Sequence, residues 1–192
     1  MGRFRKSSIS RSEYHDALHR FEHWYRDNSI YFITARCRGR FNAFAADRAK
    51  KIFWDRFEVY TKQYNFIPFV VSLLDNHYHL LGYLRIGENL GRLMRHLHGS
   101  VAKLVNDSLE IHLKPFWYDT GKQGYFDGCI RDELQCTRAF GYTHTQCRRH
   151  GICHNPTDYP HTRIYVELDR VLKRARELKP YLEDVPYKRY DQ

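Results

Sequence analysis

Two apolar segments separated by a two-residue turn constrain the fold of this chain most strongly. Residues 66–74 form a dense apolar run long enough for a buried strand, and residues 77–84 return as a second strand-like segment. Asp75 and Asn76 lie between them, and both are residue types that favour tight turns. The pattern predicts a β-hairpin within a core, and therefore an antiparallel sheet.

The segments on either side of this hairpin alternate between strand and helix patterns. Residues 31–36 alternate and are rich in β-forming types, whereas residues 46–60 carry apolar side chains at helical spacing. After the hairpin, residues 88–106 trace one apolar helical stripe, and residues 116–130 hold aromatic residues around glycines, which indicates another strand or hairpin. The order predicts an α+β fold with a ferredoxin-like antiparallel sheet and helices packed on it.

Two further helices are expected after this unit. One is predicted from about Asp132 to Arg148, because acidic residues lie in its first turn and Gly151 follows its end. Residues 165–178 have the pattern of a charged amphipathic helix.

The chain length suits a single domain with two terminal extensions. Its 192 residues are enough to bury a real core. We expect a basic arm over residues 1–28, one domain over residues 29–164, and a charged helix and tail over residues 165–192. Basic side chains on the arm and on the polar side of the second helix are predicted phosphate contacts: Arg3, Arg5, Lys6, Arg92, Arg95 and Lys103.

An excess of basic and aromatic residues favours a polyanionic partner. Lys and Arg number 32 against 22 Asp and Glu, the formal net charge is +10, and aromatic residues make up 16%. Basic groups that neutralise phosphates release counterions, and unpaired bases stack on aromatic rings. The composition therefore suits single-stranded nucleic acid, although a solvated basic surface without a partner is the alternative.

No apolar run approaches the ~20 residues that a membrane-spanning helix needs, so we expect no membrane partner. The basic, serine-rich start of the chain is not followed by the apolar segment of a signal peptide. The five cysteines are odd in number and include no C-x-x-C pair, which favours reduced thiols. These features predict a cytoplasmic, nucleoid-associated protein.

The most specific chemical pattern is the pair His77 and His79 on the predicted second strand of the hairpin. Residues two apart on a strand point to the same face, so the two imidazoles would lie side by side. Two neutral imidazoles can hold a divalent cation that polarises a phosphate oxygen. A pair of ordinary edge-strand histidines gives the same pattern, and a chain with 12 histidines produces such pairs easily.

A second element strengthens the hypothesis. Tyr142 and Gln146 are four residues apart on the predicted third helix and so share a face, beside its expected core stripe. That stripe consists of Cys136, Phe140, Thr143 and Cys147. A phenol at this place can attack a phosphodiester and form a covalent phosphotyrosine, and Gln146 can supply a third, oxygen ligand. One tyrosine among 15 carries little information alone, so the hypothesis depends on the combination.

Four segments match one known family in the same order along the chain. They are residues 70–81 with the two histidines, residues 116–133 with two aromatic blocks, residues 142–151, and residues 156–160. Together they resemble the REP-associated tyrosine transposases and their single-tyrosine relatives, which carry a histidine-hydrophobe-histidine (HUH) motif. The resemblance covers roughly residues 31–163 and implies an HUH nuclease-type fold.

The resemblance also implies an activity and a partner. It implies that His77 and His79 bind Mg2+ or Mn2+ with Gln146, and that Tyr142 is the nucleophile. The implied activity is that of a DNA transposase that binds hairpin single-stranded DNA, then cuts and rejoins it through a 5′-phosphotyrosine. Relatives act as monomers or homodimers. Two positions depart from the pattern: Gln146 stands where the family usually has Asn followed by Pro, and Tyr78 replaces a smaller hydrophobe.

Three alternatives stay open at this point. A catalytically silent ferredoxin-like nucleic-acid-binding protein, a domesticated transposase, would keep binding and form no metal-dependent covalent adduct. A histidine-triad nucleotide hydrolase needs a third histidine where this chain has Leu81. A purely structural protein would bind no DNA hairpin.

Overall fold

One antiparallel sheet organises the chain in the computed structural model, which describes residues 24–118, 124–184 and 188–189. Within these residues its five strands lie in the order β5-β2-β4-β3-β6, and every neighbouring pair is antiparallel. The strands are β2 (Ser29–Arg36), β3 (Phe66–Leu73), β4 (His77–Leu84), β5 (Phe126–Cys129) and β6 (Thr162–Ile164). The α+β fold with helices on an antiparallel sheet is confirmed, and β4 occupies the predicted residues.

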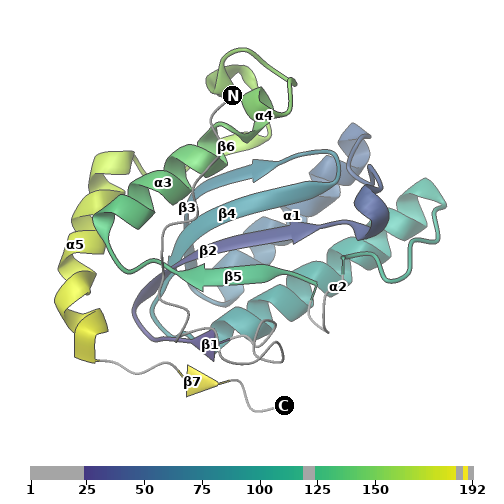
Figure 1. Cartoon of the computed structure of the whole chain (residues 1–192). Helices are drawn as coiled ribbons and strands as arrows, with labels where there is room; N and C mark the ends of the chain where they lie inside the picture. The colour runs from purple at the N-terminus through teal and green to yellow at the C-terminus, as the bar shows by residue number, and fades with distance from the viewer. Residues whose placement is uncertain (1–23, 119–123, 185–187, 190–192) are drawn as a thin grey trace.

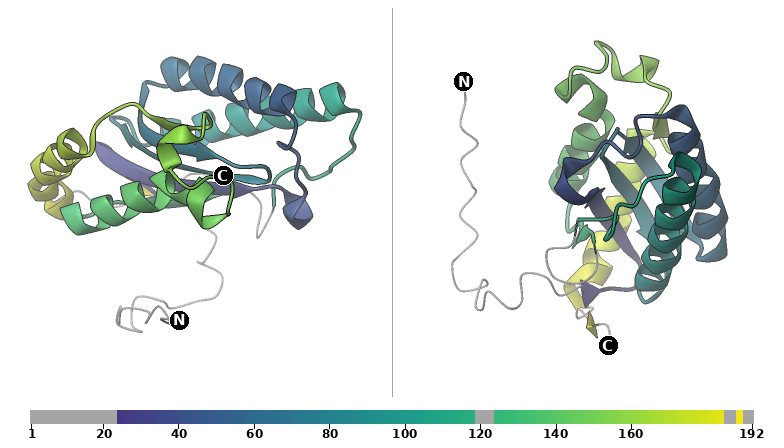
Figure 2. Two further views of the ribbon diagram at one scale, coloured as in Figure 1. Left: turned by 90° about the horizontal axis from the view of Figure 1, so that it is seen from above. Right: turned by 90° about the vertical axis from the view of Figure 1, so that its right-hand side faces the viewer.

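Helices cover both faces of the sheet, as Figures 1 and 2 show. On one face lie α1 (Asp47–Gln63) and α2 (Asn89–Leu109), which pack against each other. On the other lie α3 (Glu133–His144) and α5 (Leu168–Asp184), with the short α4 (Gln146–Arg149) directly after α3. Two single-turn helices and a small ribbon complete the described elements: η3 (Arg38–Arg40), η4 (Pro156–Asp158), β1 (Trp24–Tyr25) and β7 (Lys188–Arg189).

The alternation of side chains along β4 separates two apolar clusters in the described residues. Tyr78 and Leu80 point toward α1 and α2, whereas Leu81 and Tyr83 join the cluster under α3 and α5. All eight residues of β4 are buried, because this strand lies in the middle of the sheet with helices on both sides. The odd-numbered positions of β4 therefore face α3, and His77 and His79 are among them.

The predicted third helix is interrupted. Instead of one helix to Arg148, α3 ends at His144 and α4 begins at Gln146. The hydroxyls of Thr143 and Thr145 donate to the carbonyls four residues earlier, at 2.8 and 2.7 Å, and such bonds bend and weaken helices. The core stripe is as predicted, since its four members are all buried.

The expected C-terminal helix and part of the expected N-terminal arm lie within the described residues. The C-terminal helix begins at Leu168, and Val171, Ala175 and Leu178 are buried in the cluster under α3 and α5. The apolar side of this amphipathic helix thus belongs to the core. Residues 24–25 of the expected arm pair with β7, and the predicted contacts Arg3, Arg5 and Lys6 lie outside the described residues.

Residues 116–130 contribute less strand than the sequence pattern indicates. In the described part of this segment, β5 spans Phe126–Cys129, and Trp117 forms an isolated bridge with Cys37. All five cysteines lie in the described ranges and are free thiols. No helix among the described residues is long and apolar enough to cross a membrane.

Gly82 on β4 offers a test of how tightly the sheet packs. A Cβ there would collide with the Phe66 ring and lie 2.7 Å from the Ile67 carbonyl oxygen, so we expect Gly82→Ala to lower the free energy of unfolding by about 1–3 kcal/mol. Gly99 is the matched control, because a Cβ at this exposed position in α2 meets nothing within 4 Å. Gly99→Ala should raise the unfolding free energy by about 0.5–1 kcal/mol. Urea denaturation measures the unfolding free energy of both variants. Equal stability of the two variants would contradict the close packing of Gly82 against Phe66.

Candidate active site

The predicted histidine pair lies on the face of the sheet that α3 crosses. The side chains of His77 and His79 are 9% and 4% exposed, and their ring centroids are 5.1 Å apart. The hairpin places them there, because the two-residue turn fixes which face the odd-numbered residues of β4 occupy. Two imidazoles thus stand side by side, as the sequence predicts.

Each imidazole is held by a hydrogen bond at its Nδ1 atom. Asn76 Oδ1 lies 2.6 Å from His77 Nδ1, while the Asn76 amide nitrogen donates to the Arg40 carbonyl and to Asn42 Oδ1. Those two donations fix the amide, so its oxygen must accept from His77. Thr34 Oγ1 lies 2.7 Å from His79 Nδ1 and can accept in the same way. Both rings then present Nε2 with its lone pair, which is the form that binds metals.

The surroundings keep both rings neutral. Burial, with nearby positive charge at His150 and Arg36, lowers the pKa of His77 from 6.5 to about 4. Burial, with electrostatic interactions with His77, His150 and Arg149 that disfavour the protonated ring, lowers the pKa of His79 to about 3. At neutral pH neither ring carries a proton that would have to leave before a metal binds.

Tyr142 projects from α3 toward the same place. Its ring is edge-on to His79 at 5.0 Å between centroids and edge-on to Phe32 at 5.9 Å. The side chain is 38% exposed, so solvent or a substrate reaches it. The guanidinium carbon of Arg149 lies 4.7 Å from the centroid of the tyrosine ring. The structure therefore brings His77, His79 and Tyr142 together.

Gln146 is joined to Tyr142 through the backbone. It is 1% exposed, and its Nε2 atom donates to the Tyr142 carbonyl oxygen at 2.9 Å. The amide oxygen is thereby the atom of this side chain with lone pairs to offer. Among the described residues, no group of three or more His, Cys, Asp or Glu side chains could hold a metal ion. A metal bound between the histidines would therefore need an amide, water or phosphate oxygen as its further ligand.

Sequence analysis missed five residues around this pair. Thr34 and Arg36 are the β2 partners opposite His79 and His77, and Asn76 is the hairpin turn residue that also orients a ring. Arg149 contacts Tyr142, and the His150 ring lies 4.9 Å from the His77 ring. The basic stretch directly after the tyrosine helix indicates Arg149 and His150. The positions of Thr34 and Arg36 depend on strand register, which cannot be predicted from the sequence.

The predicted contacts on α2 lie elsewhere. This helix covers the opposite face of the sheet (Figure 2), and on that side Tyr78 Oη and His98 Nε2 are 2.8 Å apart. Arg92 pairs with Glu88 and Lys103 with Asp107, each at 2.7 Å, while Arg95 is exposed. The structure does not bring these three basic residues to the histidines, so a role in DNA binding there stays a prediction.

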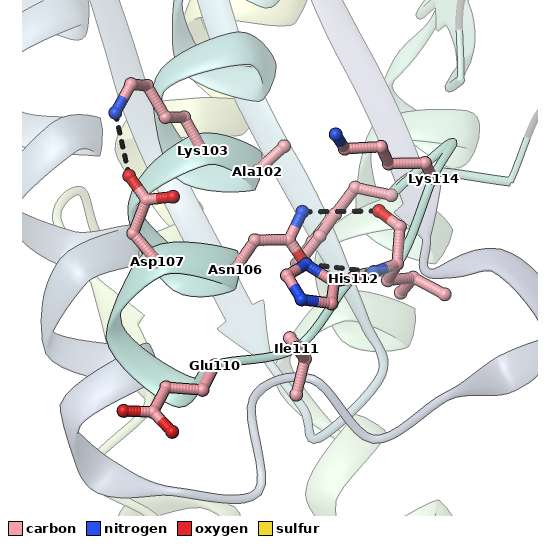
Figure 3. Close-up of a pocket in the computed structure, with 10 residues that line it drawn as sticks. Ala102, Lys103, Asn106, Asp107, Glu110, Ile111, His112 and Lys114 are labelled. Carbon is pink, nitrogen blue, oxygen red and sulfur yellow. Dashed lines mark hydrogen bonds and ion pairs between the residues drawn. The ribbon is translucent and has the colours of Figure 1, made fainter.

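A cavity of about 680 Å³ adjoins the end of α2, as Figure 3 shows. The Asn106 side chain closes the following loop by bonding both the carbonyl oxygen and the amide nitrogen of Leu113, at 3.2 and 3.1 Å. Lys103 and Asp107 line the same hollow as an ion pair, so its charges largely offset each other. This cavity is lined by α2 and the loop after it and contains none of the candidate catalytic residues.

The fold and this arrangement define a class: a ferredoxin-like sheet that carries a buried histidine pair beside an exposed tyrosine. Among solved structures, the chain is similar to a REP-associated tyrosine transposase bound to a REP hairpin. The TM-score is 0.64 at 14% sequence identity, over 79% of this chain and 86% of that one. A candidate transposase of Deinococcus radiodurans R1 also matches, with a TM-score of 0.45 and 13% identity over 59% of this chain and 88% of that one.

The first likeness shows that the two proteins share a fold, and at this identity it shows the fold alone. The resemblance drawn from the sequence is thus confirmed for the architecture. No family model and no curated protein matches the chain. The chemistry must therefore be argued from the residues of this chain.

The lowered pKa values predict a pH dependence of stability. In the unfolded chain the histidines become protonated near pH 6.5, whereas in the folded protein His77 becomes protonated only near pH 4 and His79 only near pH 3. Because the unfolded state binds more protons, a lower pH favours unfolding. Between pH 7 and 5 the metal-free protein should lose about 1–2 kcal/mol per histidine. The His77→Gln/His79→Gln double variant should lose correspondingly less. Urea denaturation at both pH values measures this; equal losses in the two proteins would contradict neutral histidines.

Proposed function

We propose that this protein is a DNA transposase that cuts and rejoins single-stranded, hairpin-forming DNA through Tyr142. The observation that carries the proposal is the 5.0 Å approach of the Tyr142 ring to His79, which stands beside His77 on the same face. A nucleophile next to two metal-binding nitrogens is the arrangement that metal-assisted phosphodiester cleavage needs.

The histidine pair and Gln146 suit a divalent cation. Two neutral Nε2 atoms and an amide oxygen form a mixed nitrogen and oxygen donor set. That set favours Mn2+ over Mg2+, since Mg2+ prefers oxygen ligands throughout. Bound there, the cation would polarise an oxygen of the scissile phosphate. The hydrogen bonds from Asn76 and Thr34 would hold the rings in place for it.

The cleavage step exchanges one phosphate ester for another. The Tyr142 oxygen attacks phosphorus, the bond from phosphorus to the 3′ oxygen breaks, and a 5′-phosphotyrosine remains. The phenol loses its proton to solvent, which reaches the partly exposed side chain, and the released 3′ oxygen takes up a proton. Because the ester energy is retained, a 3′ hydroxyl can later attack the phosphotyrosine and rejoin the strand.

Arg149 supplies positive charge where negative charge would develop. Its guanidinium lies over the Tyr142 ring at 4.7 Å, and its charge is also felt at His79. A fixed cation near a nucleophile and phosphate stabilises the transition state more than the ground state. We assign Arg149 the role of holding the phosphate against Tyr142.

The choice of DNA as substrate rests on charge and on the shared fold. The net charge of +10 suits a polyanion, and the structure with the same fold is bound to a REP hairpin. Arg92, Arg95 and Lys103 on α2 are the proposed contacts to the phosphates of a hairpin stem, which would replace Glu88 and Asp107 as partners of Arg92 and Lys103.

A covalent-trapping assay tests the proposed chemistry. Protein is incubated with labelled hairpin-containing single-stranded DNAs, with Mn2+ or Mg2+, and adducts are resolved by denaturing electrophoresis. We expect an adduct with the natural protein and none with Tyr142→Phe or with chelator. Tyr165→Phe is the matched control, because Tyr165 has a similar exposure of 43% against 38%. DNA retardation on a native gel without any adduct would instead favour the catalytically silent binding protein.

Adjacent arginines give a test of the role of Arg149. At saturating DNA, Arg149→Ala should slow adduct formation by about 10- to 1000-fold, because a transition-state charge contact is lost. Arg148→Ala should change the rate by no more than about three-fold, as is usual for exposed positions. Equal effects of the two substitutions would show that general basic charge, and not the contact with Tyr142, matters.

A further inference from the structure

The face of the sheet beside the candidate active site carries large exposed aromatic rings. On this face α3 packs over β3, β4 and β6 and α5 contacts β2, whereas the edge strand β5 has no comparable helix packing among the described residues. Phe126 on β5 is 62% exposed, the most exposed large apolar side chain of the described residues, and Tyr118 is 42% exposed. Exposed rings that lie next to each other and to a candidate site provide apolar area that a partner can cover.

Strand register places Phe126 in line with the histidines. Phe126 pairs with Thr34, and Thr34 pairs with His79, so the three side chains share one row on one face. Neighbouring strands are about 4.8 Å apart, which sets Phe126 roughly 10 Å from the His79 position. The ring lies next to Gly128, where a Cβ would be 3.7 Å from it and where no side chain occupies the surface. A flat ring thus lies two strands from the candidate cleavage site.

A cation and a second ring continue this surface. Arg36 pairs with His77 across β2 and β4, and its guanidinium carbon lies 5.0 Å from the centroid of the Tyr118 ring. Tyr118 is tied to the same strand, because its backbone nitrogen donates to the Arg36 carbonyl at 2.6 Å. The positive charge of Arg36 contributes to the lowered pKa of His77, so its electrostatic field extends to the candidate active site.

We propose that Phe126, Arg36 and Tyr118 form a binding surface for unpaired nucleotides next to the cleaved phosphate, with a base stacked on Phe126. Single-strand binding surfaces combine aromatic rings with arginine, since bases stack on rings and guanidinium groups hold phosphates. The inference rests on the proposed function, because it extends the same site along the same strand. At a stacked rise of about 3.4 Å per nucleotide, Phe126 lies within about three nucleotides of the phosphate that Tyr142 attacks.

Equilibrium binding separates this surface from the chemistry. Fluorescence anisotropy with a labelled thymidine oligonucleotide of ~12 nucleotides is measured in the Tyr142→Phe background, where no covalent step occurs. Phe126→Ala should raise Kd by about ten-fold and leave the slope of log K against log salt unchanged, because stacking releases no counterions. Phe126→Trp should bind as the parent does. Leu134→Ala is the matched control, since Leu134 on α3 is 59% exposed and outside this surface.

The outcomes distinguish this inference from the proposed function. A Kd unchanged by Phe126→Ala, or raised equally by Leu134→Ala, overturns the stacking surface, whatever the trapping assay gives. A lower sedimentation coefficient of free Phe126→Ala would also overturn it, because the ring would then serve contact between two copies of the chain. The expected ten-fold loss without any Tyr142 adduct would uphold the surface and reject the tyrosine chemistry.

Discussion

The antiparallel pairing of β2 with β4 fixes the positions of the two histidines and of their partners on the sheet. Its register sets Thr34 opposite His79 and Arg36 opposite His77. A shift by one residue would turn both histidines into the cluster under α1 and α2 and replace them by Tyr78. That shift is strongly disfavoured, because Tyr78 and Leu80 fill one apolar cluster and Leu81 fills the other. The packing of an ordinary core thereby specifies which imidazoles face α3.

Burial of the two histidines has an energetic cost that the hydrogen bonds offset only in part. A buried imidazole loses its contacts with water, and Asn76 and Thr34 return one hydrogen bond to each ring. The charged form is disfavoured further by the guanidinium groups of Arg36, near His77, and Arg149, near His79. These cations weaken stability in acid, yet they are the groups that would attract a phosphate. Placing charges for a ligand at some expense of stability is typical of functional sites.

Sequence reasoning succeeded where local patterns determine the structure. The hairpin and the shared face of His77 and His79 both follow from period and turn chemistry. It failed where tertiary context decides. The register that gives His79 its Thr34 partner, and the packing of the last helix on α3, depend on segments far apart in the chain. Strand β6 escaped prediction because three residues carry too little periodicity to recognise.

The turn after α3 joins the nucleophile to the residues that follow it. Thr145 ends α3, and the Arg149 guanidinium on α4 lies 4.7 Å from the Tyr142 ring centroid, because helical side chains point back toward the N-terminus. The Gln146 amide, by donating to the Tyr142 carbonyl, holds the two sides of this turn together. The side chain that would be the third metal ligand thus also fixes the backbone that carries the nucleophile, so any shift of Tyr142 relative to the histidines would move Gln146 with it.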